Sequence, residues 1–287
     1  MIVVTGATGK LGRLVVEGLL KKVPAREVGV AVRSPEKAKA LAVRGVEIRP
    51  ADYSRPETLA KAFAGAEKVL LVSSSQVGQR APQHLAVIDA AKRAGVRLLA
   101  YTSILHGEAS RLALAAEHQA TEAALRASGL PWVFLRNGWY VENYTEHLDP
   151  ALQHGAFVGS AGAGRIAAAT RADFAEAAVA VLTGLGHEKK AYELAGDRPF
   201  TMAELAAEVS RQVGRTIVYT DLPPEQYKAI LTGAGVPGPY ADLLVDSDLC
   251  IARGELDDAS GDLRRLIGRP TTPLADAVAA ALGRSRP

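Results

Sequence analysis

The chain has 287 residues, of which 48% are hydrophobic and 23% charged, the composition of an ordinary globular protein. Its 34 basic and 31 acidic residues are too evenly balanced to indicate a nucleic-acid surface. The single cysteine, Cys250, excludes internal disulfides and multi-cysteine metal sites and fits a reducing, cytoplasmic location. No apolar run approaches the roughly 18 residues that a membrane-spanning helix needs, so we expect no stable membrane insertion.

Apolar, β-rich runs alternate with helical patterns through the first half of the chain. They predict strands at 2–5, 28–32, 46–49, 68–73, 96–102 and 132–136. These runs lack polar alternation, so both of their faces should be buried, as in a parallel sheet covered by helices. The sequence therefore predicts an α/β fold with a Rossmann-type, doubly wound parallel sheet.

Signals for helix ends fall between these runs. The stretches Ser54–Glu57 and Thr201–Glu204 both have the spacing of a capping box and predict helix starts. Ser34-Pro35 predicts another start, with Ser34 as the cap residue. Left-handed C-caps are expected at three glycines that each follow a helical stretch, namely Gly65, Gly95 and Gly129.

The rhythm loosens after about residue 135. A helix around 172–182 and a strand at 192–194 are interpreted as returns to the main sheet. We therefore predict a Rossmann domain over residues 1–150 with returning segments at about 165–196. Residues 197–287 are predicted to form a smaller C-terminal α/β lobe on the substrate side.

A glycine-rich loop joins the first predicted strand to the first predicted helix. Its glycines at 6, 9 and 12 suit a tight turn, a close approach to a pyrophosphate and close helix–strand packing. The spacing is Gly-x-x-Gly-x-x-Gly, and the alternative is a plain strand-to-helix turn. The predicted cofactor contacts in this loop are Gly6, Thr8, Gly9, Lys10, Leu11 and Gly12.

Arg33 indicates which dinucleotide the chain binds. An NAD site usually places an acid at the end of the second strand, whereas this strand ends in Val32-Arg33-Ser34. A guanidinium there suits the 2′-phosphate of NADP, so residues 1–150 are predicted to bind NADPH. A solvated surface arginine is the alternative for Arg33.

Other polar residues follow the later strands, at the edge where ligands gather in such a sheet. Asp52 and Tyr53 follow the third strand, and Asp52 is predicted to contact the adenine, with a turn residue as the alternative. Further contacts to the cofactor are predicted from the ends of the fourth and fifth strands, at Ser73, Ser74, Ser75, Thr102 and Ser103.

Several familiar chemistries are missing. None of the eight tyrosines is followed four residues later by lysine, so the Tyr-x-x-x-Lys acid of short-chain dehydrogenases is absent. Neither Gly-x-Ser-x-Gly nor His-Glu-x-x-His occurs, so neither a hydrolase elbow nor a metal site is predicted. Quinones need little acid assistance to accept a hydride, which makes them the natural candidates for a substrate.

The sequence resembles the NmrA-like branch of the atypical short-chain dehydrogenases, and within it the bacterial type 2 NAD(P)H:quinone oxidoreductases. The matching stretches span nearly the whole chain: Thr5–Gly12, Val32–Ala38, Ser73–His84, Tyr101–Ser103, Leu135–Tyr144, Tyr192–Asp197 and Ile267–Thr272. The glycine loop is unspecific, whereas Ser73–His84 and Leu135–Tyr144 are much more specific.

The resemblance implies reduction of a quinone by direct hydride transfer from NADPH, with no flavin. Isoflavone-type reductases of this branch carry a lysine near the nicotinamide, and His118 stands in the corresponding place here. His118 is therefore predicted to orient the nicotinamide ribose or to donate a proton, with ordinary helix packing as the alternative. Residues 76–80 are interpreted as a mobile loop over the cofactor, in which Arg80 is alternatively a solvated residue.

The segment after the sixth strand should lie at the nicotinamide end. The predicted substrate-side residues there are Asn137, Tyr140 and Asn143. Trp139 and Tyr140 are predicted to wall an aromatic substrate by stacking, with core packing between the lobes as the alternative for both. Two other functions stay open: a non-catalytic NADP(H) sensor, or a reductase or isomerase of another small molecule. The sequence also leaves open the oligomeric state, a homodimer included.

Overall fold

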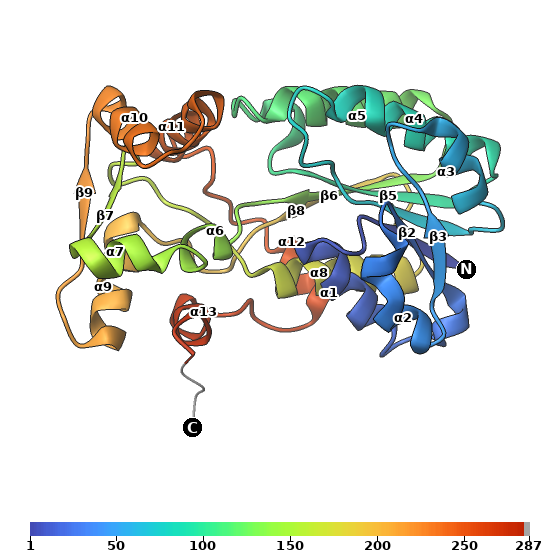
Figure 1. Ribbon diagram of the computed structural model, residues 1–287, viewed down its shortest axis with the longest axis horizontal. Coiled ribbons are helices and arrows are strands. Elements are labelled where there is room, and N and C mark those ends of the chain that lie inside the picture. Colours follow the sequence, from blue (N-terminus) through green and yellow to red (C-terminus); the bar gives the residue numbers. More distant parts are fainter. Residues whose placement is uncertain (284–287) are drawn as a thin grey trace.

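The computed structural model describes residues 1–283, within which one parallel sheet organises the larger lobe (Figure 1). Its strand order is β3-β2-β1-β4-β5-β6-β8, which confirms the doubly wound prediction. The strands are β1 (Ile2–Thr5), β2 (Val28–Val32), β3 (Glu47–Pro50), β4 (Lys68–Leu71), β5 (Leu98–Ile104), β6 (Trp132–Asn137) and β8 (Lys190–Leu194).

Helices cover both faces of this sheet (Figure 1). One face packs against α1 (Lys10–Leu19), α2 (Lys39–Val43), α8 (Arg171–Thr183) and α12 (Asp262–Ile267). The other packs against α3 (Pro56–Ala62), α4 (Arg80–Arg93) and α5 (Ala115–Ala127). Leu263 of α12 is fully buried in the first of these cores, so the chain returns to the larger lobe even after the smaller one has been built.

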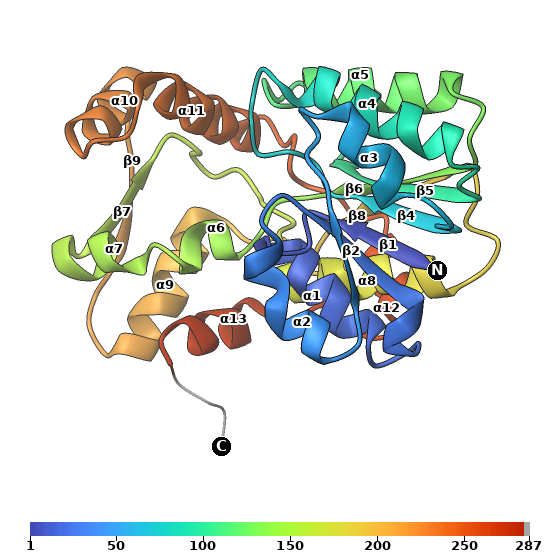
Figure 2. The same ribbon diagram turned by 45° about the vertical axis from the view of Figure 1, so that its right-hand side comes forward.

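The smaller lobe lies beyond the carboxyl ends of the strands (Figure 2). It contains a two-stranded parallel sheet of β7 (Ala156–Gly159) and β9 (Val218–Asp221), of which β7 precedes the predicted lobe of residues 197–287. Its helices are α6 (Glu142–Thr145), α7 (Leu148–His154), α9 (Met202–Val213), α10 (Pro224–Gly233), α11 (Gly238–Ala252) and α13 (Leu274–Ala281).

Local signals succeed where they match the backbone geometry. Thr201 and Glu204 form the predicted capping box, and Gly65, Gly95 and Gly129 adopt positive φ after their helices. The prediction at Ser54 is wrong: α3 has Arg55 at its cap position and no side-chain cap. The Ser54 hydroxyl instead accepts a hydrogen bond from Gln83 Nε2 at 3.0 Å.

No helix within residues 1–283 is both long enough and apolar enough to cross a membrane.

Candidate functional site

The glycine loop forms a cradle that side chains would fill. Gly6 has φ +58°, and the Gly9 N–H donates to Gly6 O at 2.9 Å. A Cβ on Gly12 would lie only 2.4 Å from Gly6 O, so the turn and α1 pack closely because residue 12 has no side chain. Helix α1 has no side-chain cap and no acidic residue in its first turn, so its N-terminal N–H groups can donate hydrogen bonds to a bound anion.

Lys10 joins this loop to the smaller lobe. Its Nζ lies 2.6 Å from Glu146 Oε2, and Arg171 Nη1 lies 2.7 Å from the other oxygen of Glu146. Burial raises the pKa of Glu146, but the contacts with Lys10 and Arg171 outweigh burial and lower it. The Arg171 guanidinium also covers the Tyr140 ring, 5.0 Å from its centroid.

Arg33, at the end of the second strand, is exposed beyond β2 and forms no ion pair within residues 1–283. Asp52 Oδ1 accepts the N–H of Ser54 at 2.9 Å, which is the geometry expected if Asp52 is a turn residue rather than an adenine contact. The Tyr53 hydroxyl donates to Val72 O at 2.9 Å and contacts Thr5 Oγ1. Burial raises the pKa of Tyr53, so it is a neutral brace across β1 and β4.

The ends of β4 and β5 are fixed to each other. Thr102 Oγ1 accepts the Ser73 N–H at 2.8 Å, and His84 Nε2 accepts the Ser74 N–H at 3.0 Å. These side-chain bonds replace strand pairing, which is why β4 ends at Leu71 rather than at the predicted residue 73. Ser75 is exposed, whereas the Ser103 hydroxyl points to Glu122, to which it donates at 2.7 Å.

His118 lies among buried polar groups on α5. Arg80 Nη1 lies 3.4 Å from its Nε2, and the Tyr101 hydroxyl lies 2.7 Å from its Nδ1. Because a guanidinium can only donate, Nε2 accepts and the imidazole proton belongs on Nδ1. Burial, together with the charges of Arg80 and His84, lowers the pKa of His118 to about 3. It is therefore neutral near pH 7 and unsuited to donate a proton there.

Asn137 and Tyr140 meet at the end of β6. Asn137 Nδ2 lies 3.4 Å from the Tyr140 hydroxyl, while its buried Oδ1 has no hydrogen-bond partner within residues 1–283. Tyr140 also meets Phe174 edge-on at 5.3 Å, and burial raises its pKa. Asn143 is half-buried nearby, and Trp139 packs against the core of the smaller lobe.

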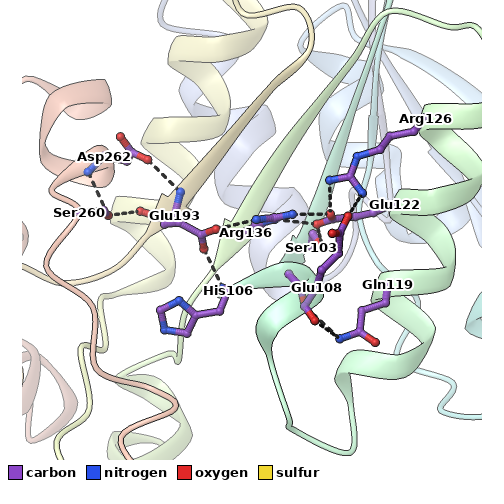
Figure 3. Close-up of polar contacts among 11 residues, drawn as sticks. Ser103, His106, Glu108, Gln119, Glu122, Arg126, Arg136, Glu193, Ser260 and Asp262 are labelled. Carbon is purple, nitrogen blue, oxygen red and sulfur yellow. Dashed lines mark hydrogen bonds and ion pairs between the residues drawn. The ribbon is translucent and has the colours of Figure 1, made fainter.

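A buried charge network lies beneath this edge, on three neighbouring strands and α5 (Figure 3). Arg136 of β6 pairs with Glu122 and with Glu193 of β8, each at 2.7 Å. Glu193 Oε2 in turn accepts the backbone N–H of His106 at 2.7 Å, which holds the loop after β5. Sequence reasoning missed this network, because nothing in the sequence marks three charged residues as partners across strands.

Sequence reasoning also missed Glu117, Glu146 and Arg171. Each gains its role from a contact with a residue at least 25 positions away. Within residues 1–283, no group of three or more His, Cys, Asp or Glu side chains is arranged to hold a metal ion.

The site residues fit a dinucleotide. The cradle at Gly6–Gly12 offers the N–H groups at the start of α1 to a pyrophosphate, and Arg33, which forms no ion pair within the described residues, offers its guanidinium at the end of β2. The orphaned Asn137 Oδ1 at the other end can accept an amide N–H. Across the sheet, Arg33 follows β2, the cradle follows β1 and Asn137 ends β6. This is the order in which the 2′-phosphate, the pyrophosphate and the nicotinamide of a dinucleotide would cross such a sheet.

Comparisons with known proteins agree with this geometry. A family model described as NAD(P)H-binding matches residues 6–184. Quinone oxidoreductase 2 of Escherichia coli is 52% identical over 278 residues, covering 97% of each chain. Its solved complex with NADPH superposes with a TM-score of 0.96 at 51% identity, over 98% of this chain and all of that one. A triphenylmethane reductase of Citrobacter in complex with NADP(H) gives a TM-score of 0.95 at 43% identity, over 98% of this chain and all of that one.

Proposed function

Because the chain belongs to the NAD(P)H-binding family and is a homologue of E. coli quinone oxidoreductase 2 over nearly its whole length, we propose that it reduces quinones with NADPH. The observation that carries this proposal is the full-length match to a solved complex with NADPH, joined to a cradle and an Arg33 that suit the same cofactor.

The chain's own residues bind and orient the cofactor. The N–H groups at the start of α1 hold the pyrophosphate, and Arg33 holds the 2′-phosphate. Asn137 Oδ1 accepts from the carboxamide and so fixes the face of the nicotinamide ring. NADPH, when bound, supplies a hydride; no flavin is needed.

The buried groups near the nicotinamide end favour a substrate that needs little acid. His118 is neutral, and burial raises the pKa values of Tyr101 and Tyr140, which makes both phenols weaker acids. A quinone suits such a site because the anion left by hydride transfer is stabilised by resonance. A simple ketone would leave an alkoxide, which requires a proton in the same step.

Turnover with a substrate panel tests the proposal. Purified protein is titrated with NADPH by fluorescence, and loss of NADPH absorbance is followed with a benzoquinone, a naphthoquinone, a triphenylmethane dye and a ketone. We expect saturable binding and turnover of the quinones. Tight binding without turnover would favour a non-catalytic sensor, and turnover restricted to the other substrates would favour a different reductase.

A cytoplasmic location of the protein stays a prediction, and a homodimer is one of the oligomeric states that stay open. The location is supported only by the single cysteine, Cys250, which is buried and free. Light scattering coupled to size-exclusion chromatography measures the oligomeric state.

A further inference from the structure

Arg80 occupies a fixed place between β4 and α5. It is the first residue of α4, and its Nε donates to Ser74 O at 2.5 Å while Nη1 reaches His118 Nε2. The Glu117 carboxylate accepts the backbone N–H groups of Gly78 and Arg80 at 3.0 and 2.9 Å. The loop at 76–80 is thus anchored to α5 by three contacts, and the guanidinium lies between Ser74, after β4, and His118 of α5.

The charge of Arg80 is uncompensated. Within residues 1–283 its guanidinium forms no ion pair, and the side chains around it, His118 and His84, are neutral. The nearby Glu117 carboxylate is already used by the backbone of the loop. A half-buried guanidinium that lies beside neutral histidines and is not neutralised by a carboxylate is suited to bind an anion.

His118 cannot be that cation. Its Nε2 accepts from Arg80, so a second proton there would place two positive groups in contact. The cation beside His118 is thus Arg80, from the start of α4.

Building on the proposed quinone reduction, we propose that the Arg80 guanidinium is the group that stabilises negative charge on the substrate oxygen. The quinone accepts a hydride from NADPH, which forms one O–H bond and oxidises NADPH to NADP⁺. The two electrons leave a negative charge on the second quinone oxygen, which lies against Arg80 until a proton from water neutralises it. A charged donor aimed at developing charge acts mainly on kcat.

The test uses Arg80→Gln, Arg80→Lys and the matched control Arg93→Gln, an exposed arginine near the other end of the same helix. We expect Arg80→Gln to lower kcat about 100-fold, within the range for loss of one such donor, while NADPH affinity changes little. Arg80→Lys should recover part of the loss, because it keeps the charge. The control should match the wild type.

Two further readouts do not depend on turnover. A nitrophenol imitates the reduced quinone, and its colour reports its ionisation; bound to the wild-type protein with NADP⁺, its pKa should fall. That fall should vanish in Arg80→Gln. In the free protein, NMR should show a higher His118 pKa in Arg80→Gln. Burial lowers this pKa most, and the charge of Arg80, together with that of His84, lowers it further.

The outcomes separate this inference from the proposed function. If no quinone is turned over by the wild type, both fail. If quinones are turned over equally by Arg80→Gln, only the inference on Arg80 fails. A loss confined to NADPH affinity would assign Arg80 to the cofactor phosphates and overturn it. Should Arg80→Gln not fold, an unshifted nitrophenol pKa in the wild-type protein would be enough to reject it.

Discussion

The ammonium of Lys10 lies 2.6 Å from a carboxylate oxygen of Glu146, so an ion pair joins the glycine loop to the start of the smaller lobe. The Lys10 side chain is 68% exposed, and an exposed pair of this kind contributes only about 0–1 kcal/mol to stability. Its main consequence is therefore electrostatic, because it places a negative charge beside a loop that is built for phosphate.

Glu146→Gln should tighten NADPH binding several-fold. The substitution removes the anion that competes with phosphate for Lys10 and Arg171, so the gain should shrink as salt is raised. Fluorescence titration at low and high salt measures both effects. Glu17→Gln, in an exposed pair with Arg44 on the same lobe, is the control; an equal gain there would point to net charge alone.

Arg33→Ala should weaken NADPH much more than NADH, by about 10- to 100-fold, because only NADPH carries a 2′-phosphate. Dissociation constants for both cofactors give the comparison, with the exposed Arg26→Ala as control. Equal losses for the two cofactors would show that Arg33 does not recognise the 2′-phosphate.

Asp248→Asn should stabilise the protein at high pH. Burial, followed by the charge of Asp221, raises the pKa of Asp248 to about 6, although the Ser160 N–H bond lowers it. The folded state therefore holds this proton more tightly than the unfolded state, and stability falls as pH rises from about 4 to about 6.

Asparagine keeps the acceptor for the Ser160 N–H, which lies 2.7 Å from Asp248 Oδ2, and has no charge to bury. Denaturant unfolding should show similar stability for variant and wild type near pH 4. Above pH 7 the variant should gain roughly 2–3 kcal/mol. A difference that does not change with pH would contradict the raised pKa.

Glu122→Ala should be strongly destabilising, by about 3–5 kcal/mol, because it leaves Arg136 without its fully buried partner (Figure 3). Glu122→Gln should lose less, since its amide oxygen still accepts. The control Glu108→Ala removes an exposed partner of Arg126 and should change the unfolding midpoint little. Similar losses for Glu108→Ala and Glu122→Ala would contradict the role of burial.

The fold was accessible from sequence because its signals are local. Unbroken apolar runs marked the strands of the parallel sheet, and one glycine loop marked the first turn. The resemblance, carried by stretches such as Ser73–His84, also predicted the family, which the comparisons confirm. NADPH is the cofactor in the solved complex of the E. coli relative, and that relative is a quinone oxidoreductase. The individual site residues stay predictions, supported most by the open cradle and by Asn137.

The sequence did not reveal side-chain contacts between residues that lie far apart in the chain. The role of His118 depends on Arg80 and Tyr101, which lie on two other elements, and its lowered pKa follows from their packing. Ser103 was predicted to end the fifth strand, but β5 continues to Ile104, and the Ser103 hydroxyl belongs to the Glu122 network. Spacing along the chain contains no information about such contacts.

The late return of α12 to the larger lobe has a consequence for synthesis. Strand β8 and α12 complete the sheet and its core, yet they are formed by residues 190–194 and 262–267, late in the chain. During synthesis β6 therefore stays an unpaired edge until β8 has emerged, and the apolar surface that Leu263 covers stays exposed until α12 has emerged. The core of the larger lobe is thus completed only after most of the smaller lobe has been synthesised.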